Sequence, residues 1–369
     1  MFVILHRKKI VFMRKHFNIL ILPAAVAFVI VVVMLVSYLH APDENQPDYS
    51  QKAYIHLIGS PLKPDNVSDY IWVSPQFNAT DVPPGNYSGL VRLAGNHYAV
   101  VSDAGTPKGY YNFSIDIDTT GQITAIHNNG FRKLGDVNDD QEAVTYDADC
   151  HHIYIGNEET AAIEEFDALN GRKLNRQVIS DFKRLAVHNR IIESLTYDPT
   201  ENCLYTCNEG PLRGDPGQMI RIRKFDTDLH DTGEYTYVMD DPLSEVKIGD
   251  NSHAFGVAEL LAIGDGTLLV LEREFLVAPA GIGSWVVNKI FRFKPGVEEK
   301  QYVTGWRTQL NVDDFTLANY EGMCLGPKLP NGRQVVILCA DSQNRVHGVL
   351  RDWFRTILIY LKSATTRLI

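Results

Sequence analysis

The chain has 369 residues, and 45% of them are hydrophobic, which is enough apolar material for one large domain with a buried core. Its net charge of −10 is unevenly spread: five basic and no acidic side chains precede Asp43, so the remainder carries a net charge of −15. This distribution argues against a nucleic-acid partner, which would need a basic footprint on the protein.

The N-terminus predicts a membrane anchor. A basic tail, residues 1–16, precedes an apolar segment, residues 17–40, which is about as long as the ~20 residues that span a bilayer. Basic residues ahead of such a segment predict a cytoplasmic N-terminus, so we expect a single-pass protein whose main domain is periplasmic or extracellular. A cleaved signal peptide is the alternative, although its apolar core is usually ~7–15 residues long. Residues 41–52 then form a polar tether.

Two stretches of the chain are near-copies of each other, offset by 51 residues. They run over Glu142–Glu158 and Glu193–Glu209, and seven of their 17 positions are identical. Each has two β-branched and aromatic runs around a polar turn, which predicts a β-hairpin. Looser copies begin at Gly89, Glu259 and Glu321. Similarity at a fixed spacing is typical of repeat architectures.

Further alternating segments between the hairpins bring each unit to roughly four strands, the content of a propeller blade. We therefore expect residues 53–361 to form an all-β fold, a β-propeller of six blades. Five blades would be built on the hairpins, and a sixth would be shared by the two chain ends, with Tyr54–Ile58 and Thr356–Leu361 as closing strands. A β-sandwich is the alternative, but it needs no near-identical units. Residues 362–369 form a tail.

Carboxylates begin and end each near-copy. In an antiparallel hairpin the start of the first strand lies beside the end of the second. We therefore expect Glu142 near Glu158, and Glu193 near Glu209, on one rim of the ring. Crowded carboxylates cannot all stay ionised cheaply, so either a pKa rises or a cation binds. Ca²⁺, which takes about six to eight oxygen ligands, suits such a rim.

These motifs resemble the phytase-like family, described by the phrase "esterase-like activity of phytase". The resemblance rests on Glu142-Ala-Val-Thr-Tyr-Asp, on Glu193-Ser-Leu-Thr-Tyr-Asp, on Leu-Leu-Val-Leu-Glu272-Arg273 and on Tyr-Glu321-Gly-Met, and it covers about residues 85–359. It implies a propeller whose carboxylates converge on the axis, and an activity on esters or phosphoesters. The sequence departs from the family pattern in two ways. Glycine follows Glu321, but Ala143 and Ser194 stand in that place after Glu142 and Glu193, and the first hairpin begins with Gly89 in place of an acid.

We therefore expect a hydrolase of phosphate or other small-molecule esters that uses a divalent cation, with Ca²⁺ as the candidate. The expected catalytic residues are Glu142, Glu193, Glu259, Glu321, Arg190 and Arg273. The expected metal ligands are Glu142, Glu158, Glu193, Glu209, Glu272 and Asp341. An acidic rim repels a phosphate ester, so the activity would need the cation, an arginine clamp or both.

Three other interpretations of the rim remain open. The carboxylates could cap turns, with Arg190 and Arg273 pairing with neighbouring glutamates. The domain could be a non-catalytic binding propeller with structural calcium, because a fold does not determine a function. It could also be a calcium-dependent lactonase, since gluconolactonase-like propellers place a metal at the axis.

Overall fold

The computed structural model describes residues 71–103, 108–137, 140–187, 190–244, 252–279, 281–297 and 299–361. The predicted basic tail, anchor and tether over residues 1–52 lie outside these ranges, as do the strand expected at Tyr54–Ile58 and the tail over residues 362–369. Within the described ranges, no helix combines the length and the apolar character needed to cross a membrane.

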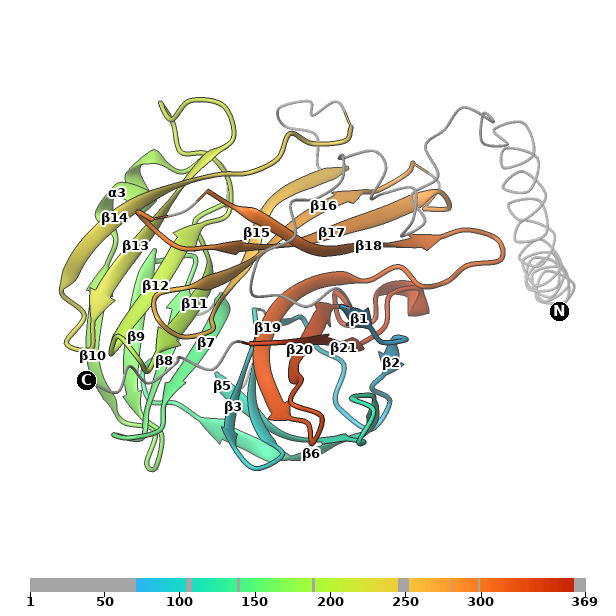
Figure 1. Cartoon of the computed structure of the whole chain (residues 1–369), viewed down its shortest axis with the longest axis horizontal. Helices are drawn as coiled ribbons and strands as arrows, with labels where there is room; N and C mark the ends of the chain where they lie inside the picture. The colour runs from blue at the N-terminus through green and yellow to red at the C-terminus, as the bar shows by residue number, and fades with distance from the viewer. Residues whose placement is uncertain are drawn as a thin grey trace, which may run out of the picture.

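Five antiparallel sheets surround a central axis in the described part of the chain (Figure 1), and we number them as blades 1 to 5 in chain order. Blade 1 comprises β3 (Tyr87–Ala94), β4 (His97–Ser102), β5 (Gly109–Ile117) and β6 (Ile123–Lys133). Blade 2 comprises β7 (Gln141–Asp147), β8 (His152–Asn157), β9 (Ala162–Asp167) and β10 (Lys173–Val178). Blade 3 comprises β11 (Ile192–Asp198), β12 (Cys203–Asn208), β13 (Met219–Asp226) and β14 (Asp231–Val238).

Blade 4 comprises β15 (His253–Ala262), β16 (Leu268–Leu276), β17 (Ser284–Phe293) and β18 (Gln301–Leu310). Blade 5 comprises β19 (Asn319–Lys328), β20 (Gln334–Asp341), β21 (Trp353–Ile359), β1 (Trp72–Val73) and β2 (Phe77–Asn78). A short helix, α3 (Ser180–Leu185), lies between blades 2 and 3 in the chain, and a 3-10 turn, η1 (Val346–Gly348), precedes β21.

The first strand of each blade is its inner strand. These strands, β3, β7, β11, β15 and β19, contact one another in sequence, and β19 contacts β3 to close the ring. The predicted propeller is therefore confirmed, but the prediction of six blades is wrong, because the described residues close a ring of five blades. The last hairpin does not stand beside a separate closing blade: β19 and β20 pair directly with β21, and β21 pairs with β1 and β2 from the other chain end.

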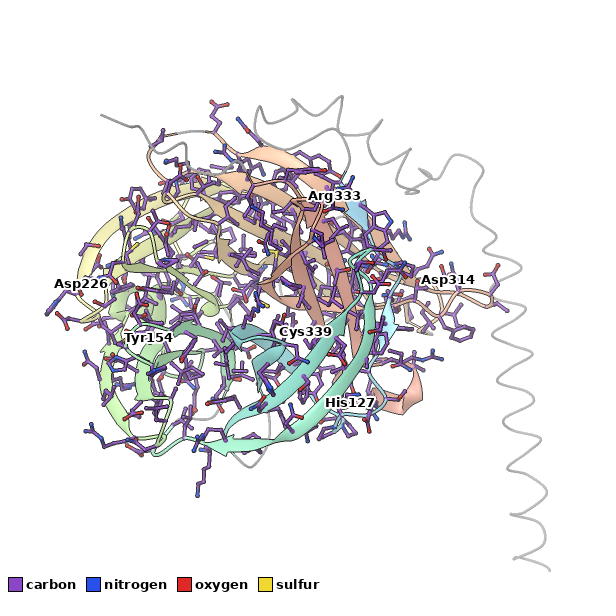
Figure 2. All side chains as sticks on the ribbon, turned by 60° about the horizontal axis from the view of Figure 1, so that its bottom comes forward. His127, Tyr154, Asp226, Asp314, Arg333 and Cys339 are labelled. Carbon is purple, nitrogen blue, oxygen red and sulfur yellow. The ribbon has the colours of Figure 1, made fainter. Side chains whose placement is uncertain are left out.

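Each interface between blades has its own apolar core. Tyr154 of blade 2 packs with Phe225 of blade 3, and Tyr205 of blade 3 packs with Val270 of blade 4. Separate clusters join blades 1 and 2, blades 4 and 5, and blades 5 and 1. Figure 2 shows Cys339, which is fully buried, among the inner side chains, whereas Asp226 and Asp314 lie at the periphery. Tyr154 and Tyr205, which are identical in the two near-copies, thus both pack between blades.

The hairpins form as the sequence predicts. The register of β7 with β8 and of β11 with β12 matches the two near-copies residue for residue. Asp147 and Asp198 act in turns, because the Oδ1 atom of each accepts the backbone N–H two residues later, at 2.9 and 2.8 Å. The two near-copies are thus the inner hairpins of neighbouring blades.

Candidate metal and active site

A register shift interrupts the pairing of every inner strand with its neighbour. In β7 the partners step from Gln141↔Asn157 to Ala143↔Gly156, which leaves Glu142 as the extra residue of a bulge. A β-bulge re-aims a side chain and bends its strand. The same step in the other inner strands leaves these bulged residues: Ser88, Glu193, Ala258 and Glu321.

Each blade also contributes two further residues near the bulge. One lies at or just after the end of the pairing on the second strand, such as Glu158, and the other lies opposite it on the inner strand, such as Asp140. Together with the bulged residue, these positions form what we call the rim, at the end of the axis where the inner strands begin. Blade 2 supplies three carboxylates there, Asp140, Glu142 and Glu158, whereas blade 4 supplies none and places Arg273 there instead. The other rim residues are Asn86, Ser88, Asp103, Ile191, Glu193, Glu209, Gly256, Ala258, Asn319, Glu321 and Asp341.

The three carboxylates of blade 2 form a cluster suited to a metal ion. Asp140, Glu142 and Glu158 each offer one carboxylate oxygen within 4.8 Å of the other two. Glu142 is 7% exposed, and within the described residues its carboxylate has no hydrogen-bond partner. The backbone N–H of Ile191 donates to Oε1 of Glu158 at 3.0 Å and orients that side chain. Three carboxylates make a hard oxygen donor set of the kind that Ca²⁺ and Mg²⁺ prefer.

Burial and mutual repulsion favour the neutral forms of these acids. Burial is the largest cause that raises the pKa of Glu158 to about 8, and the nearby Glu209 and Asp140 add to it. Burial together with the charges of Glu321, Asp103 and Glu158 holds the pKa of Glu142 well above its usual range. A bound cation would reverse this effect, because it favours the ionised form.

Glu193 and Glu321 belong to the same electrostatic group. Burial, followed by the charge of Glu142, raises the pKa of Glu193, whose carboxylate has no hydrogen-bond partner among the described residues. Burial and the charge of Asp341 raise the pKa of Glu321, while Arg273 opposes them. Burial also raises the pKa of Asp341, although the backbone N–H of Gln343 donates to its Oδ1 at 2.7 Å.

An alternating chain of charges occupies the opposite part of the rim. Arg190 donates from Nε to Oε2 of Glu209 at 3.0 Å, and Arg273 donates from Nη2 to Oε1 of the same carboxylate at 2.8 Å. Nη1 of Arg273 also donates to Oε1 of Glu321 at 2.7 Å and to Oδ1 of Asn319 at 2.8 Å. Burial opposes the charge of Arg273, but Glu321 and Glu209 outweigh it and raise its pKa. The printed ion pairs of the rim therefore join Arg190 and Arg273 to carboxylates of blades 3 and 5.

Two glycines make room for this chain of charges. A Cβ atom on Gly256 would lie 2.6 Å from both Cγ and the carbonyl oxygen of Glu209. A Cβ atom on Gly210 would lie 2.6 Å from Cζ of Arg190, so the guanidinium group rests against the backbone there. Nη2 of Arg190 is buried and has no hydrogen-bond partner in the part of the chain that the structure describes, so it leaves a donor beside Glu209.

Most of the predicted site residues meet at this rim: Glu142, Glu158, Glu193, Glu209, Glu321, Asp341, Arg190 and Arg273. Glu272 does not, because alternation along β16 turns it to the side opposite Arg273. There it accepts from Oη of Tyr237 at 2.7 Å and from Nζ of Lys300 at 2.9 Å. The expectation that Glu259 occupies the place of Glu142 is also corrected, because the bulge of β15 lies at Ala258 and Glu259 is the next residue.

Sequence reasoning missed several rim residues, among them Asp140, Asp103 and Asn319. Asp140 precedes β7 by one residue, and its carbonyl oxygen accepts the N–H of Glu158 at 3.1 Å. The signal that could have identified it is the acidic run over residues 136–140, directly before the repeat. Asp103 is equivalent to Glu158, since each follows the second strand of its blade, and it ends the first hairpin, whose bulge lies at Ser88.

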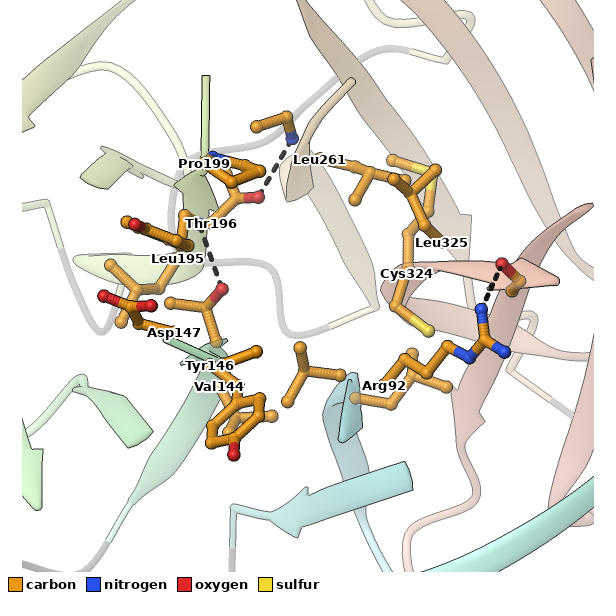
Figure 3. Close-up of a pocket in the computed structure, with 18 of the residues that line it drawn as sticks. Arg92, Val144, Tyr146, Asp147, Leu195, Thr196, Pro199, Leu261, Cys324 and Leu325 are labelled. Atoms are coloured by element: carbon orange, nitrogen blue, oxygen red, sulfur yellow. Dashed lines mark hydrogen bonds between the residues drawn. The ribbon is translucent and has the colours of Figure 1, made fainter. Parts of the chain in front are cut away.

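A cavity of about 370 Å³ lies at the other end of the axis, where the inner strands end (Figure 3). Its walls are mostly apolar and include Leu90, Val144, Leu195 and Met323. The Thr196 hydroxyl on this wall is already hydrogen-bonded to the backbone, because its Oγ1 accepts the N–H of Ala262 at 2.9 Å. The cavity and the acidic rim thus lie at opposite ends of the propeller axis.

Comparison with known proteins identifies one family. The family model described as "Phytase-like: Esterase-like activity of phytase" matches residues 82–343. A search of curated proteins found no match.

Solved structures resemble the fold only distantly. Hydrazine synthase of Kuenenia stuttgartiensis has 13% identity and a TM-score of 0.35, over 74% of this chain and 80% of that one. Glutaminyl cyclase of Myxococcus xanthus has 9% identity and a TM-score of 0.40, over 78% and 97%. A nidogen/laminin complex has 11% identity and a TM-score of 0.34, over 75% and 84%. None of these likenesses is close enough to carry a functional argument.

Proposed function

We propose that this chain, which belongs to the phytase-like family, is a hydrolase of phosphate or other esters that depends on a divalent cation held at the rim of its propeller. The observation that carries the proposal is the blade 2 cluster, in which three carboxylates converge and Glu142 has no partner among the described residues. We propose Asp140, Glu142 and Glu158 as the cation's ligands, with Ca²⁺ as the ion that suits them.

The cation would supply polarisation of the ester oxygen and a lowered pKa for a water molecule. Glu193 is the candidate for a general base, because its carboxylate has no hydrogen-bond partner among the described residues and burial raises its pKa well above the usual range. Arg190 and Arg273 would neutralise an anionic group of the substrate. Arg273 already pairs with two carboxylates, so Arg190, with its unpartnered Nη2, is better placed to do so.

The test is an assay of the purified propeller on phosphate monoesters, phosphodiesters, carboxyl esters and lactones, with Ca²⁺ and with chelator. We expect turnover of one class that chelator abolishes and that Glu142→Gln lowers by at least about tenfold. Glu159→Gln is the matched control, because it makes the same change at the next residue along from Glu158 on an exposed side chain. Equal activity in Glu142→Gln and the wild type would refute the assignment.

Lack of turnover with a Ca²⁺-dependent rise in melting temperature would instead support a binding propeller with structural calcium. Lactone opening without phosphate release would support a lactonase. We also propose that the propeller works outside the cytoplasm on an N-terminal anchor. Protease protection of residues 1–16, with cleavage of the propeller, in intact cells would test this orientation.

A further inference from the structure

The residue after each bulge lies where neighbouring inner strands approach most closely, and four blades place a small residue there. A Cβ atom on Gly89 would lie 3.0 Å from the backbone nitrogen of Val144, and one on Gly322 would lie 3.0 Å from the carbonyl oxygen of Ser88. Blade 4 breaks this pattern, because its residue is Glu259, which is 1% exposed. The residues at this position in the other blades are Gly89, Ala143, Ser194 and Gly322.

Backbone N–H groups converge on the Glu259 carboxyl group. The N–H of Leu260 donates to Oε1 at 3.0 Å, and the N–H groups of Leu195 and Met323 act on the same carboxyl group. All three residues stand two positions after the bulge of their own blade, on the adjacent inner strands β11, β15 and β19. The bulge thus turns equivalent donors of three blades toward one point of the axis.

The chemistry of this point fits an anion. Burial raises the pKa of Glu259 well above its usual range, and the three N–H groups oppose this rise without reversing it. An ionised carboxylate only accepts hydrogen bonds, which matches three converging donors, whereas a protonated carboxyl group would also need an acceptor. The inner edge of each blade is a free sheet edge, and buried backbone donors there need a partner.

We propose that these N–H groups form an anion-binding ring on the propeller axis, which the Glu259 side chain fills in the intact protein, and that a small carboxylate such as formate occupies the ring when that side chain is removed. Leu195 and Met323 line the cavity at the far end of the axis, so the ring lies at the inner end of that cavity. Formate reaches the ring from the cavity, because the acidic rim at the opposite end repels anions.

The experiment uses the full chain with Glu259→Gly, melted in increasing sodium formate and in sodium chloride of equal ionic strength. We expect the melting temperature of this variant to be several degrees below that of the wild type. It should rise in formate, along a curve that saturates, by more than it rises in chloride. Ser194→Gly is the matched control, since it removes a buried polar side chain at the same position of the next blade. In Ser194→Gly and in the wild type, the melting temperature should change by the same amount in formate as in chloride.

Glu259→Gln keeps the proposal testable if Glu259→Gly does not fold. Its amide nitrogen would face the N–H donors, so we expect it to melt below the wild type and to gain nothing specific from formate. A formate response of Glu259→Gly no larger than that of Ser194→Gly would overturn the proposal. So would a Glu259→Gln variant as stable as the wild type, because that result would indicate a neutral side chain in place of an anion.

Discussion

Glu158 and Glu209 occupy equivalent places in neighbouring blades, yet their surroundings differ. Glu209 accepts hydrogen bonds from Arg190 and Arg273, which hold it in a chain of alternating charges. Glu158 lies beside Asp140 and Glu142, and its pKa rises to about 8. Two positions that look identical in the sequence thus differ in charge balance, because their neighbours come from different blades.

Without metal, stability is expected to fall as the pH rises from about 5 to 8. The folded pKa values of Glu142, Glu158 and Glu193 are raised, so the folded state binds more protons than the unfolded state, whose glutamates titrate near pH 4.3. The stabilisation from these bound protons is fully present below about pH 4.3, where the unfolded glutamates titrate. It is lost as the pH rises through the pKa values of the folded state. Since one pKa unit corresponds to about 1.4 kcal/mol, we expect a loss of a few kcal/mol in urea unfolding with chelator.

Saturating Ca²⁺ should reduce or reverse this loss at pH 8, because the cation binds the ionised carboxylates. Glu142→Gln should flatten the pH dependence in chelator, whereas Glu159→Gln should leave it unchanged. A metal-free protein whose stability is constant or rises between pH 5 and 8 would contradict the raised pKa values.

The bulge is the element that builds both the rim and the inner ring. It places one residue of each inner strand at the rim and turns a backbone N–H toward the axis two residues later. Because a bulge adds one residue to one strand, a hairpin alignment based on the sequence can slip by one position. Such a slip aligns Glu259 with Glu142, and it places the start of the first hairpin at Gly89 instead of Ser88.

Gly256→Ala should disturb the rim through β15. Its Cβ atom would meet Cγ and the carbonyl oxygen of Glu209 at 2.6 Å, so either the strand or the carboxylate must move. We expect a loss of about 1–3 kcal/mol in urea unfolding, as for other overpacked sites. Gly233→Ala is the control, because its nearest neighbour would be the Tyr235 hydroxyl at 3.3 Å. Equal stability of the two variants would show that β15 accommodates the methyl group freely.

At the scale of the whole molecule, the ring is closed by hydrogen bonds between distant parts of the chain. β1 and β2 pair with β21, and the N–H of Ser74 donates to the carbonyl oxygen of Thr356 at 2.9 Å. Apolar clusters at all five interfaces then join each blade to both neighbours. The rim geometry depends on this closure, since its charges come from all five blades.

Deleting residues 71–78 from the full chain should open the ring at blade 5. β21 would become an exposed edge strand, which favours association with other chains. We expect a loss of at least about 2 kcal/mol, or roughly 5 °C in melting temperature for a domain of this size, together with oligomers in size-exclusion chromatography. A monomer with an unchanged melting temperature would show that β1 and β2 do not hold the ring closed.

The sequence by itself determined the repeated hairpins, the propeller class and the pairing of Glu142 with Glu158 and of Glu193 with Glu209, because these follow from local alternation and hairpin geometry. The number of blades depends on the tertiary structure, since β1 and β21 pair through residues that stand 284 and 286 positions apart in the chain. The tertiary structure also decided that Arg273 neutralises Glu209 and Glu321, that Glu272 faces away and that Glu259 lies in the ring. These contacts form between blades, where the spacing within one repeat carries no information.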